Sequence, residues 1–379
     1  MYIAGVAETP LGKVYDHNEY SMFAIAAREA LDEAGMTLKD VDGIGVCYMG
    51  DEGTVQVGEY LGIRNARHLD STDLGGAAYE SHVNHAARAI AAGQCEVVLV
   101  GYASRQRTKN QRTMTGSYDL SSLDAQFQDA YGLPSPIGHY ALIAARHMYE
   151  FGTTSEQLAE IAVAAREWAL LNPKAYMHDA GPLTVDDVLG SRLLAEPLHK
   201  LDCCLVTDGG GVVVVTNEAR ARDARKKAIR VIGTGESQTH YRMAQWKDMT
   251  VSAGAVSGRE AFGMAGIGPQ DVDVLEPYDS FTVTVLLALE DLGFCAKGEG
   301  GAFVEKGALR PGGVLPAMTS GGGLSYNHPG ALGVLLLVEA VRQLRGECGA
   351  RQVPEAEIAV AHGVGGYLST AATVVLARD

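Results

Sequence analysis

The stretch REALDEAGMTLKDVDGI at residues 28–44 has a near copy, REAFGMAGIGPQDVDVL, at residues 259–275. The two stretches are identical at eight of 17 positions, with a constant offset of 231 residues. Two unrelated helix–turn–strand units would share about three or four residues by chance, so this identity favours an internal duplication. In each copy an apolar-periodic helix is expected to end at a glycine, Gly35 or Gly266, and a strand to follow a polar Asp-Val-Asp turn.

Further β-branched and helical stretches surround the two copies. We expect strands at residues 95–104 and 203–216, and two more within 356–377, because these runs are apolar and contain or adjoin glycines. Helices are predicted at 81–93 and 331–346. Near-continuous apolar strands that alternate with helices are typical of α/β layers with buried sheets.

The repeat also divides the chain. Residues 1–218 are predicted to form an N-terminal half and residues 219–379 a C-terminal half. The stretch from about 106 to 200 has no second copy and is rich in polar and aromatic residues. We interpret it as an insertion that covers the site.

Charge and hydropathy exclude several classes of partner. The formal net charge is -15, from 31 basic and 46 acidic residues, so nucleic acid and anionic membrane surfaces are poor ligands. An anionic ligand would need a local basic site; residues 105–112, RQRTKNQR, are the best candidate, with a solvated loop as the alternative. Without a signal peptide or a run of roughly 18 apolar residues, the protein is expected to be soluble and cytoplasmic.

The cysteines give no metal or disulfide signal. No C-x-x-C spacing occurs among them, so neither a zinc knuckle nor a disulfide framework is expected, and no metal site is predicted. The six are Cys47, Cys95, Cys203, Cys204, Cys295 and Cys348.

Five stretches, in this order, resemble the thiolase superfamily over essentially the whole chain: AARAIAAGQCEVVLVGYAS, VTDGGGVVVVT, YDSF, NHPGALG and HGVGGYLSTAATVVL. The resemblance implies an α/β, thiolase-like duplicated fold of five layers, α-β-α-β-α, here with an inserted loop domain. EPYDSFTVTVLLALEDLGF stands where classical thiolases carry Asn-Glu-Ala-Phe. This pattern is most similar to the sterol-carrier and lipid-transfer-protein thiolase-like branch.

Both family cysteines are missing. A thiolase needs a cysteine at the N-terminus of the helix before Ala-Ala-Gly, where the helix dipole and a histidine lower the pKa of the thiol. The family spacing puts this nucleophile 17 positions before Gly93, at Gly76. The second family cysteine, in a Cys-x-Gly-Gly setting, aligns with HGVGG, and we assign its place to His362. Covalent acyl transfer through cysteine is therefore not expected.

Tyrosines and a histidine stand at the family's catalytic loops. The resemblance places Tyr278 at the family Asn position, Tyr326 and His328 around the family His, and Tyr367 after the last glycine pair. Phenols donate or accept protons and stabilise oxyanions, although tyrosines also line the rims of cores. The chain thereby resembles the lipid-transfer-protein aldolases that cleave steroid side chains and lack the nucleophilic cysteine. These enzymes split a β-hydroxyacyl-CoA into a ketone, such as a 17-ketosteroid, and acetyl- or propionyl-CoA.

The resemblance implies a role for each of these side chains. Tyr326, with its pKa lowered by His328, would take the β-hydroxyl proton. Tyr367 or Tyr278 would protonate the enolate carbon.

A second group is expected to bind the substrate or its oxyanion. His328 and backbone N–H groups near the last glycine pair would stabilise the thioester oxyanion. The two glycines of the former nucleophile turn either admit a bulky ring or serve turn geometry. The candidates are Gly75, Gly76, His362, Gly365, Gly366 and Asp279.

The resemblance also implies ligands and partners. A coenzyme A thioester is the expected substrate, with no permanently bound cofactor. We expect a homodimer formed through the N-terminal half, and a small OB-fold and zinc-ribbon partner protein that gives a heterotetramer and carries any zinc. Two alternatives stay open: a divergent thiolase, or acetyl-CoA acyltransferase, acting on a 3-oxoacyl-CoA, and a non-catalytic acyl-CoA or lipid carrier.

Overall fold

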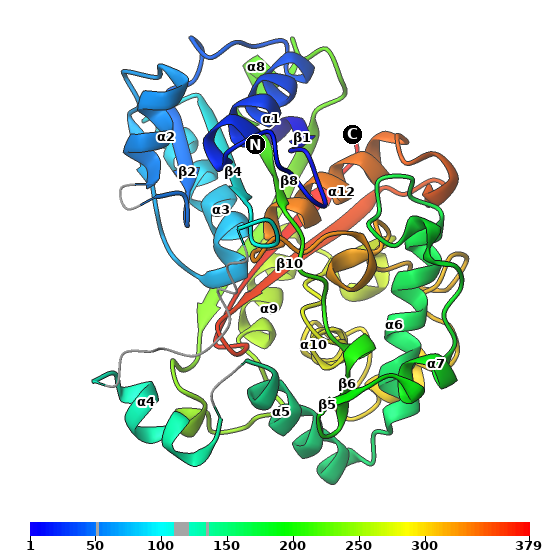
Figure 1. Cartoon of the computed structure of the whole chain (residues 1–379). Helices are drawn as coiled ribbons and strands as arrows, with labels where there is room; N and C mark the ends of the chain where they lie inside the picture. The colour runs from blue at the N-terminus through cyan, green and yellow to red at the C-terminus, as the bar shows by residue number, and fades with distance from the viewer. Residues whose placement is uncertain (51–52, 110–120, 134–135) are drawn as a thin grey trace.

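The strands of the two halves of the chain join into one sheet at the centre of the molecule, where residues 2–3 pair with residues 229–230 (Figure 1). The structure, a computed structural model, describes residues 1–50, 53–109, 121–133 and 136–379. The first elements are β1 (Tyr2–Glu8), α1 (Glu19–Glu33), β2 (Gly43–Val46), α2 (Gly53–Leu61), β3 (His68–Asp70), α3 (Ala78–Ala91) and β4 (Val97–Ser104). The middle elements are α4 (Leu123–Phe127), α5 (Pro136–Phe151), α6 (Ser155–Leu170), α7 (Val185–Gly190), β5 (Leu193–Ala195) and β6 (Leu198–His199). The last are β7 (Gly209–Thr216), α8 (Glu218–Ala221), β8 (Ile229–Gln238), α9 (Gly254–Ala265), β9 (Val274–Pro277), α10 (Thr282–Asp291), α11 (Gly300–Val304), α12 (Gly333–Arg345), β10 (Ile358–Gly365) and β11 (Thr370–Ala377).

The strand order shows the same topology twice. The large sheet runs β3-β2-β4-β7-β1 and continues β8-β11-β10-β9. In the first half β2 is parallel to β4, which is antiparallel to β7, which is antiparallel to β1. In the second half β9, β10, β11 and β8 repeat these directions, and a parallel bridge between Leu275 and Ala317 takes the place of β3. This is the arrangement that a duplication predicts.

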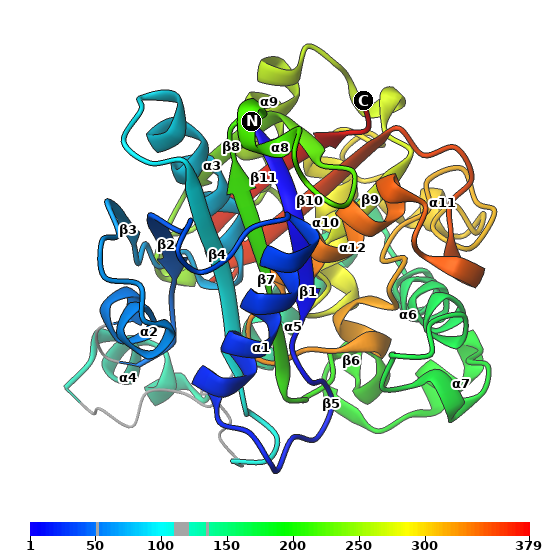
Figure 2. The same ribbon diagram turned by 90° about the horizontal axis from the view of Figure 1, so that it is seen from above.

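Helices separate and cover the strands in five layers. α1 packs on β1, β4 and β7, and α9 packs on β8 and β11. α3 and α12 contact each other and strands of both halves, so they form the central layer. Figure 2 shows α1 lying over β1 and β7. Every residue of β4 and β7 is buried, because both faces of these strands are covered. The predicted α/β thiolase-like layering is confirmed.

The two repeat copies fold as the sequence predicted. In each copy the helix, α1 or α9, is followed by a glycine in the left-handed region, Gly35 at φ 68° and Gly266 at φ 71°. A short turn then leads into β2 or β9. The boundary expected at 218/219 falls between β7 and β8, and it stays a prediction.

One predicted strand is shorter than expected. Residues 203–208 do not extend β7, because their backbone groups bond to two other loops. The N–H of Cys204 donates to the carbonyl of Ser280 at 2.9 Å, and that of Leu205 donates to the carbonyl of Gly323 at 2.9 Å. The segment therefore holds the loops at 280 and 323 together.

The helices α4 to α7, which lie in the sequence between β4 and β7, run along the lower and right sides of the molecule in Figure 1. Its helix α6 packs against residues 322–326, and the Arg166 guanidinium there donates to Ser325 Oγ at 3.3 Å. Across the described ranges, no helix combines the length and the apolar character needed to cross a bilayer. All six cysteines are free thiols.

Candidate active site

A pocket of about 950 Å³ opens where the N-terminus of α3, the end of β10 and the loop after β9 meet. Its floor includes Gly75, Gly76 and Gly365. The volume lies in the range of small-molecule sites. Among the residues that the structure describes, six tyrosines line it: Tyr20, Tyr48, Tyr102, Tyr140, Tyr278 and Tyr367.

Tyr278 lines this pocket and forms a hydrogen-bonded pair with His328, which is not among the described lining residues. Tyr278 follows β9 directly, and its hydroxyl lies 3.1 Å from His328 Nε2. Both side chains are buried, and burial lowers the pKa of His328 to about 4 while it raises the pKa of Tyr278. The imidazole is therefore neutral at pH 7, and in the tautomer with its hydrogen on Nδ1 the Nε2 atom accepts a hydrogen bond from the phenol. Such a pair can accept a substrate proton on the phenol oxygen while the phenol's own proton moves to the imidazole.

The Tyr278 ring fills the space of a side chain at position 76. A Cβ built on Gly76 would lie 2.3 Å from Tyr278 Cε2 and 2.6 Å from Cζ. Only glycine fits there, because carbon atoms in contact need about 3.5 Å. The space of a side chain at Gly76 is thus taken by the phenol ring, while the approach of a bulky substrate ring to this glycine, which lines the pocket, stays a prediction.

Gly75 serves the turn that enters α3. Its φ is 60°, and a Cβ would lie 2.7 Å from Gly365 Cα. Of the two roles considered for this glycine, the structure therefore supports the tight turn. Its N–H donates to Asp73 Oδ1 at 2.9 Å, which fixes the start of the helix.

Asp279 lies behind the loop of residues 321–328 and does not line the pocket. Its carboxylate accepts the N–H of Gly323 at 2.6 Å and of Leu324 at 3.0 Å. Burial raises the pKa of Asp279 to about 7, against the lowering effect of these two N–H groups. Asp279 thereby holds the glycine turn that carries His328. Its predicted substrate contact is absent from the part of the pocket lining that the structure describes.

Tyr326 points away from the pocket. It ends a single π-helical turn, Gly322–Tyr326, and its hydroxyl donates to Glu8 Oε1 at 2.5 Å. Arg342 binds the same carboxylate at 2.7 Å, and Lys174 also contacts it. Burial and the Glu8 charge raise the pKa of Tyr326, so the lowering predicted from His328 is wrong. The structure makes Tyr326 an anchor of the loop.

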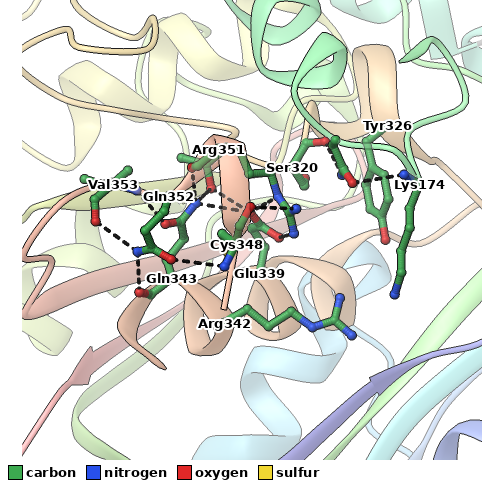
Figure 3. A network of polar contacts seen from close by, with 12 residues as sticks. Lys174, Ser320, Tyr326, Glu339, Arg342, Gln343, Cys348, Arg351, Gln352 and Val353 are labelled. Carbon is green, nitrogen blue, oxygen red and sulfur yellow. Dashed lines mark hydrogen bonds and ion pairs between the residues drawn. The ribbon is translucent and has the colours of Figure 1, made fainter. Parts of the chain in front are cut away.

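A second buried network fixes the residues before this loop. Figure 3 shows Arg351 and Gln343 converging on Glu339 of α12. Arg351 binds both Glu339 oxygens at 2.9 Å, and Thr319 Oγ1 donates to the same carboxylate at 2.9 Å. The N–H of Thr319 donates to Oε1 of Glu276 on β9 at 3.1 Å. β9, α12 and the loop at 319 are therefore held as one unit.

His362 faces the side of β10 opposite to α3. Its Nδ1 lies 2.9 Å from Thr373 Oγ1, and a Cβ on Gly254 of α9 would lie 3.0 Å from its ring. The next residue, Gly363, faces α3 instead, since a Cβ there would lie 2.8 Å from Ala77 Cα. Adjacent strand residues point to opposite faces, so the assignment of His362 to the site is wrong.

Gly365, Gly366 and Tyr367 line the pocket wall. The Tyr367 ring stacks on His139 with 3.8 Å between centroids, and Tyr140 donates to the Gly366 carbonyl at 3.1 Å. Tyr140 comes from α5, in the segment that has no repeat copy. Its apolar helical context gave no sign of a pocket position.

The basic stretch at 105–112 reaches the pocket in part. Lys109 lines it and pairs with Glu19 Oε1 at 2.5 Å. Residues 110–112 lie outside the described residues. Within the described ranges, no three His, Cys, Asp or Glu side chains cluster as a metal site.

Comparison with known proteins agrees with this architecture. Residues 235–378 match the family described as thiolase C-terminal domain-like. The chain is 37% identical over 357 residues to 17-hydroxy-3-oxo-4-pregnene-20-carboxyl-CoA lyase of Mycobacterium tuberculosis, covering 91% of each chain. It is 33% identical to acetyl-CoA acetyltransferase of Methanothermobacter thermautotrophicus, covering 99% of each. The solved structure of an "Ltp2-ChsH2(DUF35) aldolase" superposes with a TM-score of 0.90 at 31% identity, covering 100% of this chain and 97% of that one.

A duplicated five-layer α/β fold with its pocket at the N-terminus of a central helix defines a thiolase-type scaffold. Gly76 and the Tyr278 ring stand at the position that the family spacing gives to the nucleophile. The chain belongs to the thiolase superfamily, in the branch that contains the sterol-carrier and lipid-transfer-protein thiolase-like proteins.

Proposed function

We propose that this protein is a carbon–carbon lyase that cleaves a β-hydroxyacyl-CoA by a retro-aldol reaction. The observation that carries the proposal is the hydrogen-bonded pair of Tyr278 and His328. The Tyr278 ring of this pair fills the space of a side chain at Gly76. The position at which a thiolase keeps its nucleophile thus holds a proton-transfer group.

The thiols support this proposal. No cysteine is found among the described residues that line the pocket. Burial raises the pKa of Cys95 to about 11 and of Cys203 and Cys295 to about 12. A thiolate is the reactive form of cysteine, and these thiols stay protonated at neutral pH.

The reaction needs two proton transfers. The Tyr278 oxygen takes the β-hydroxyl proton while the phenol proton moves to His328 Nε2. The bond between Cα and Cβ then breaks, the ketone forms at Cβ, and the electron pair passes into the thioester enolate. A second group returns a proton to Cα and completes the short acyl-CoA; Tyr367 is the candidate from the sequence. Backbone N–H groups near Gly365 and Gly366 are the proposed oxyanion site.

The substrate class follows from the relatives. One relative is named as a lyase of a 17-hydroxysteroid carboxyl-CoA, and a similar solved structure is named as an aldolase. We infer a steroid side-chain CoA thioester here, which gives a 17-ketosteroid and propionyl-CoA. A pocket of about 950 Å³ has room for such rings.

The name of that solved structure joins Ltp2 to ChsH2 (DUF35). We infer that this chain likewise works with a small partner of OB-fold and zinc-ribbon type, as a heterotetramer built on a homodimer through the N-terminal half. Any zinc would then belong to the partner.

The test is Tyr278→Phe, assayed with 17-hydroxy-3-oxo-4-pregnene-20-carboxyl-CoA in the presence of the partner. Loss of the hydroxyl removes the proton path, so we expect kcat to fall by about 10²- to 10⁴-fold. Tyr149→Phe is the matched control, because Tyr149 is 84% exposed on α5. Equal activity of Tyr278→Phe and the control would refute the proposal.

A further inference from the structure

The loop of residues 328–332, here called the His328 loop, contacts the Tyr278 phenol at both of its ends. His328 Nε2 lies 3.1 Å from the Tyr278 hydroxyl. Burial raises the pKa of Tyr278, and a hydrogen bond from the backbone of Leu332 lowers it. The loop belongs to no helix or strand of the described structure, so contacts from other segments have to fix it. Its position decides whether both groups reach the phenol together.

Two hydroxyl groups of β4 hold the middle of the His328 loop. The Tyr102 hydroxyl donates to the carbonyl of Pro329 at 2.9 Å, and Ser104 Oγ donates to the same carbonyl. One residue separates the two on β4, so their side chains leave the strand on the same face. Burial raises the pKa of Tyr102 to about 12, so its hydroxyl keeps the proton that it donates. Gly330 has a φ of 102°, and a Cβ there would lie 3.2 Å from the Tyr102 hydroxyl, so the loop packs directly on this side chain.

Thr207 holds the backbone of His328 itself. The N–H of His328 donates to Thr207 Oγ1 at 2.9 Å, and the N–H of Thr207 donates to the carbonyl of His328 at 3.2 Å. Thr207 is buried and is absent from the described lining of the pocket. Its hydroxyl therefore acts on the loop without forming part of the pocket wall.

The contact between His328 and the phenol depends on this support. A shift of the loop by about 1 Å would lengthen the 3.1 Å contact to about 4 Å, which is beyond hydrogen-bond range. A displacement of this size can slow an enzyme reaction by about 100-fold. Within the proposed retro-aldol function, we propose that Tyr102, Ser104 and Thr207 are positioning residues. They hold the His328 loop against the phenol and transfer no proton themselves.

Thr207→Val tests this role, because valine keeps the shape of threonine and lacks the hydroxyl. The enzyme with its partner is assayed with 17-hydroxy-3-oxo-4-pregnene-20-carboxyl-CoA. We expect Thr207→Val to lower kcat by about 10- to 100-fold at an unchanged KM. Thr207→Ser restores the hydroxyl and should recover most of kcat. Combining Tyr102→Phe with Ser104→Ala should lower kcat over the same range, and each change alone should lower it less, because the other hydroxyl still holds the carbonyl.

A positioning role also predicts that the effect depends on the phenol. Thr207→Val should change kcat little in an enzyme that already carries Tyr278→Phe, since the contact that Thr207 supports is then lost. Thr373→Val is the matched control. Thr373 is a buried threonine of β11 outside the described pocket lining, and its hydroxyl also bonds inside the core, to Ser257 and His362. We expect this control to lose thermal stability and to keep the wild-type kcat.

A folded Thr207→Val enzyme with wild-type kcat overturns the positioning role and leaves the lyase function intact. An equal loss of kcat with and without Tyr278→Phe also overturns it, because the effect then does not pass through the phenol. Should Thr207→Val fail to fold, the β4 double variant carries the same test, and a raised KM at unchanged kcat makes its hydroxyls substrate contacts and overturns the role. A wild-type enzyme that releases no ketone overturns the proposed function, and this role with it.

Discussion

Replacing Gly76 by alanine tests the packing of the Tyr278 ring on the former nucleophile turn. The new methyl carbon would lie 2.3 Å and 2.6 Å from two ring carbons, where ordinary contact needs about 3.5 Å. The same carbon would lie 2.6 Å from the Val364 carbonyl oxygen, so both this backbone and the ring must shift, the ring by about 1 Å, which breaks the 3.1 Å hydrogen bond to His328. Overpacking of this kind also costs about 1–3 kcal/mol of folding free energy.

Loss of the pair should lower kcat by about 10²- to 10⁴-fold, or about 2.7–5.5 kcal/mol of transition-state stabilisation. Initial rates of ketone release from the steroid CoA thioester measure this effect, and thermal melting confirms that the variant is folded. Gly263→Ala is the matched control, since its methyl group would meet no described atom within 4 Å in helix α9. A folded Gly76→Ala enzyme with wild-type kcat would show that the phenol ring and its contact with His328 are irrelevant to catalysis.

Three further predictions concern buried side chains outside the pocket. Tyr326→Phe should lower the free energy of unfolding by about 1–2 kcal/mol, measured with urea, because it loses the hydrogen bond to its carboxylate partner. In steady-state kinetics it should lower kcat less than Tyr278→Phe does. Arg351→Leu should cost about 3–5 kcal/mol in urea unfolding, because it leaves the buried Glu339 unpaired. The pKa of buried His362 is about 4, below its ordinary 6.5, so the unfolded chain binds more protons between these values. The contribution of this histidine to the free energy of unfolding should therefore fall by up to about 3 kcal/mol as the pH drops from 6.5 to 4. In unfolding curves measured across this range, His362→Asn should show a weaker dependence of that free energy on pH.

The fold was predictable because its signals are local and occur twice. The helix ends at Gly35 and Gly266, the Asp-Val-Asp turns and the apolar strands all depend on neighbours along the chain. The loss of a thiol at Gly76 also followed from motif spacing. The position of Tyr278 at the pocket followed from the likeness of the YDSF stretch to the family motif that carries the Asn.

Directions of side chains were not predictable in the same way. Tyr326 turns toward Glu8, 318 residues earlier in the chain, and no spacing rule connects the two. His362 was chosen by its likeness to a motif, whereas the pleat of β10 turns that side chain away from α3. Glu80 has the sequence signature of a solvent-facing helical residue, and its burial depends on glycines at positions 333 and 363 in the other half.

The dependence of cleavage on free coenzyme A tests the central claim most directly. The enzyme and its partner are incubated with 17-hydroxy-3-oxo-4-pregnene-20-carboxyl-CoA, with and without added coenzyme A, and the ketone and propionyl-CoA are quantified. Because the proposed site transfers protons and uses no thiol, we predict equal amounts of both products at a rate independent of free coenzyme A, with no acyl group on any cysteine. Products that form only with added coenzyme A, together with a thioester adduct on a cysteine of this chain, would contradict the account.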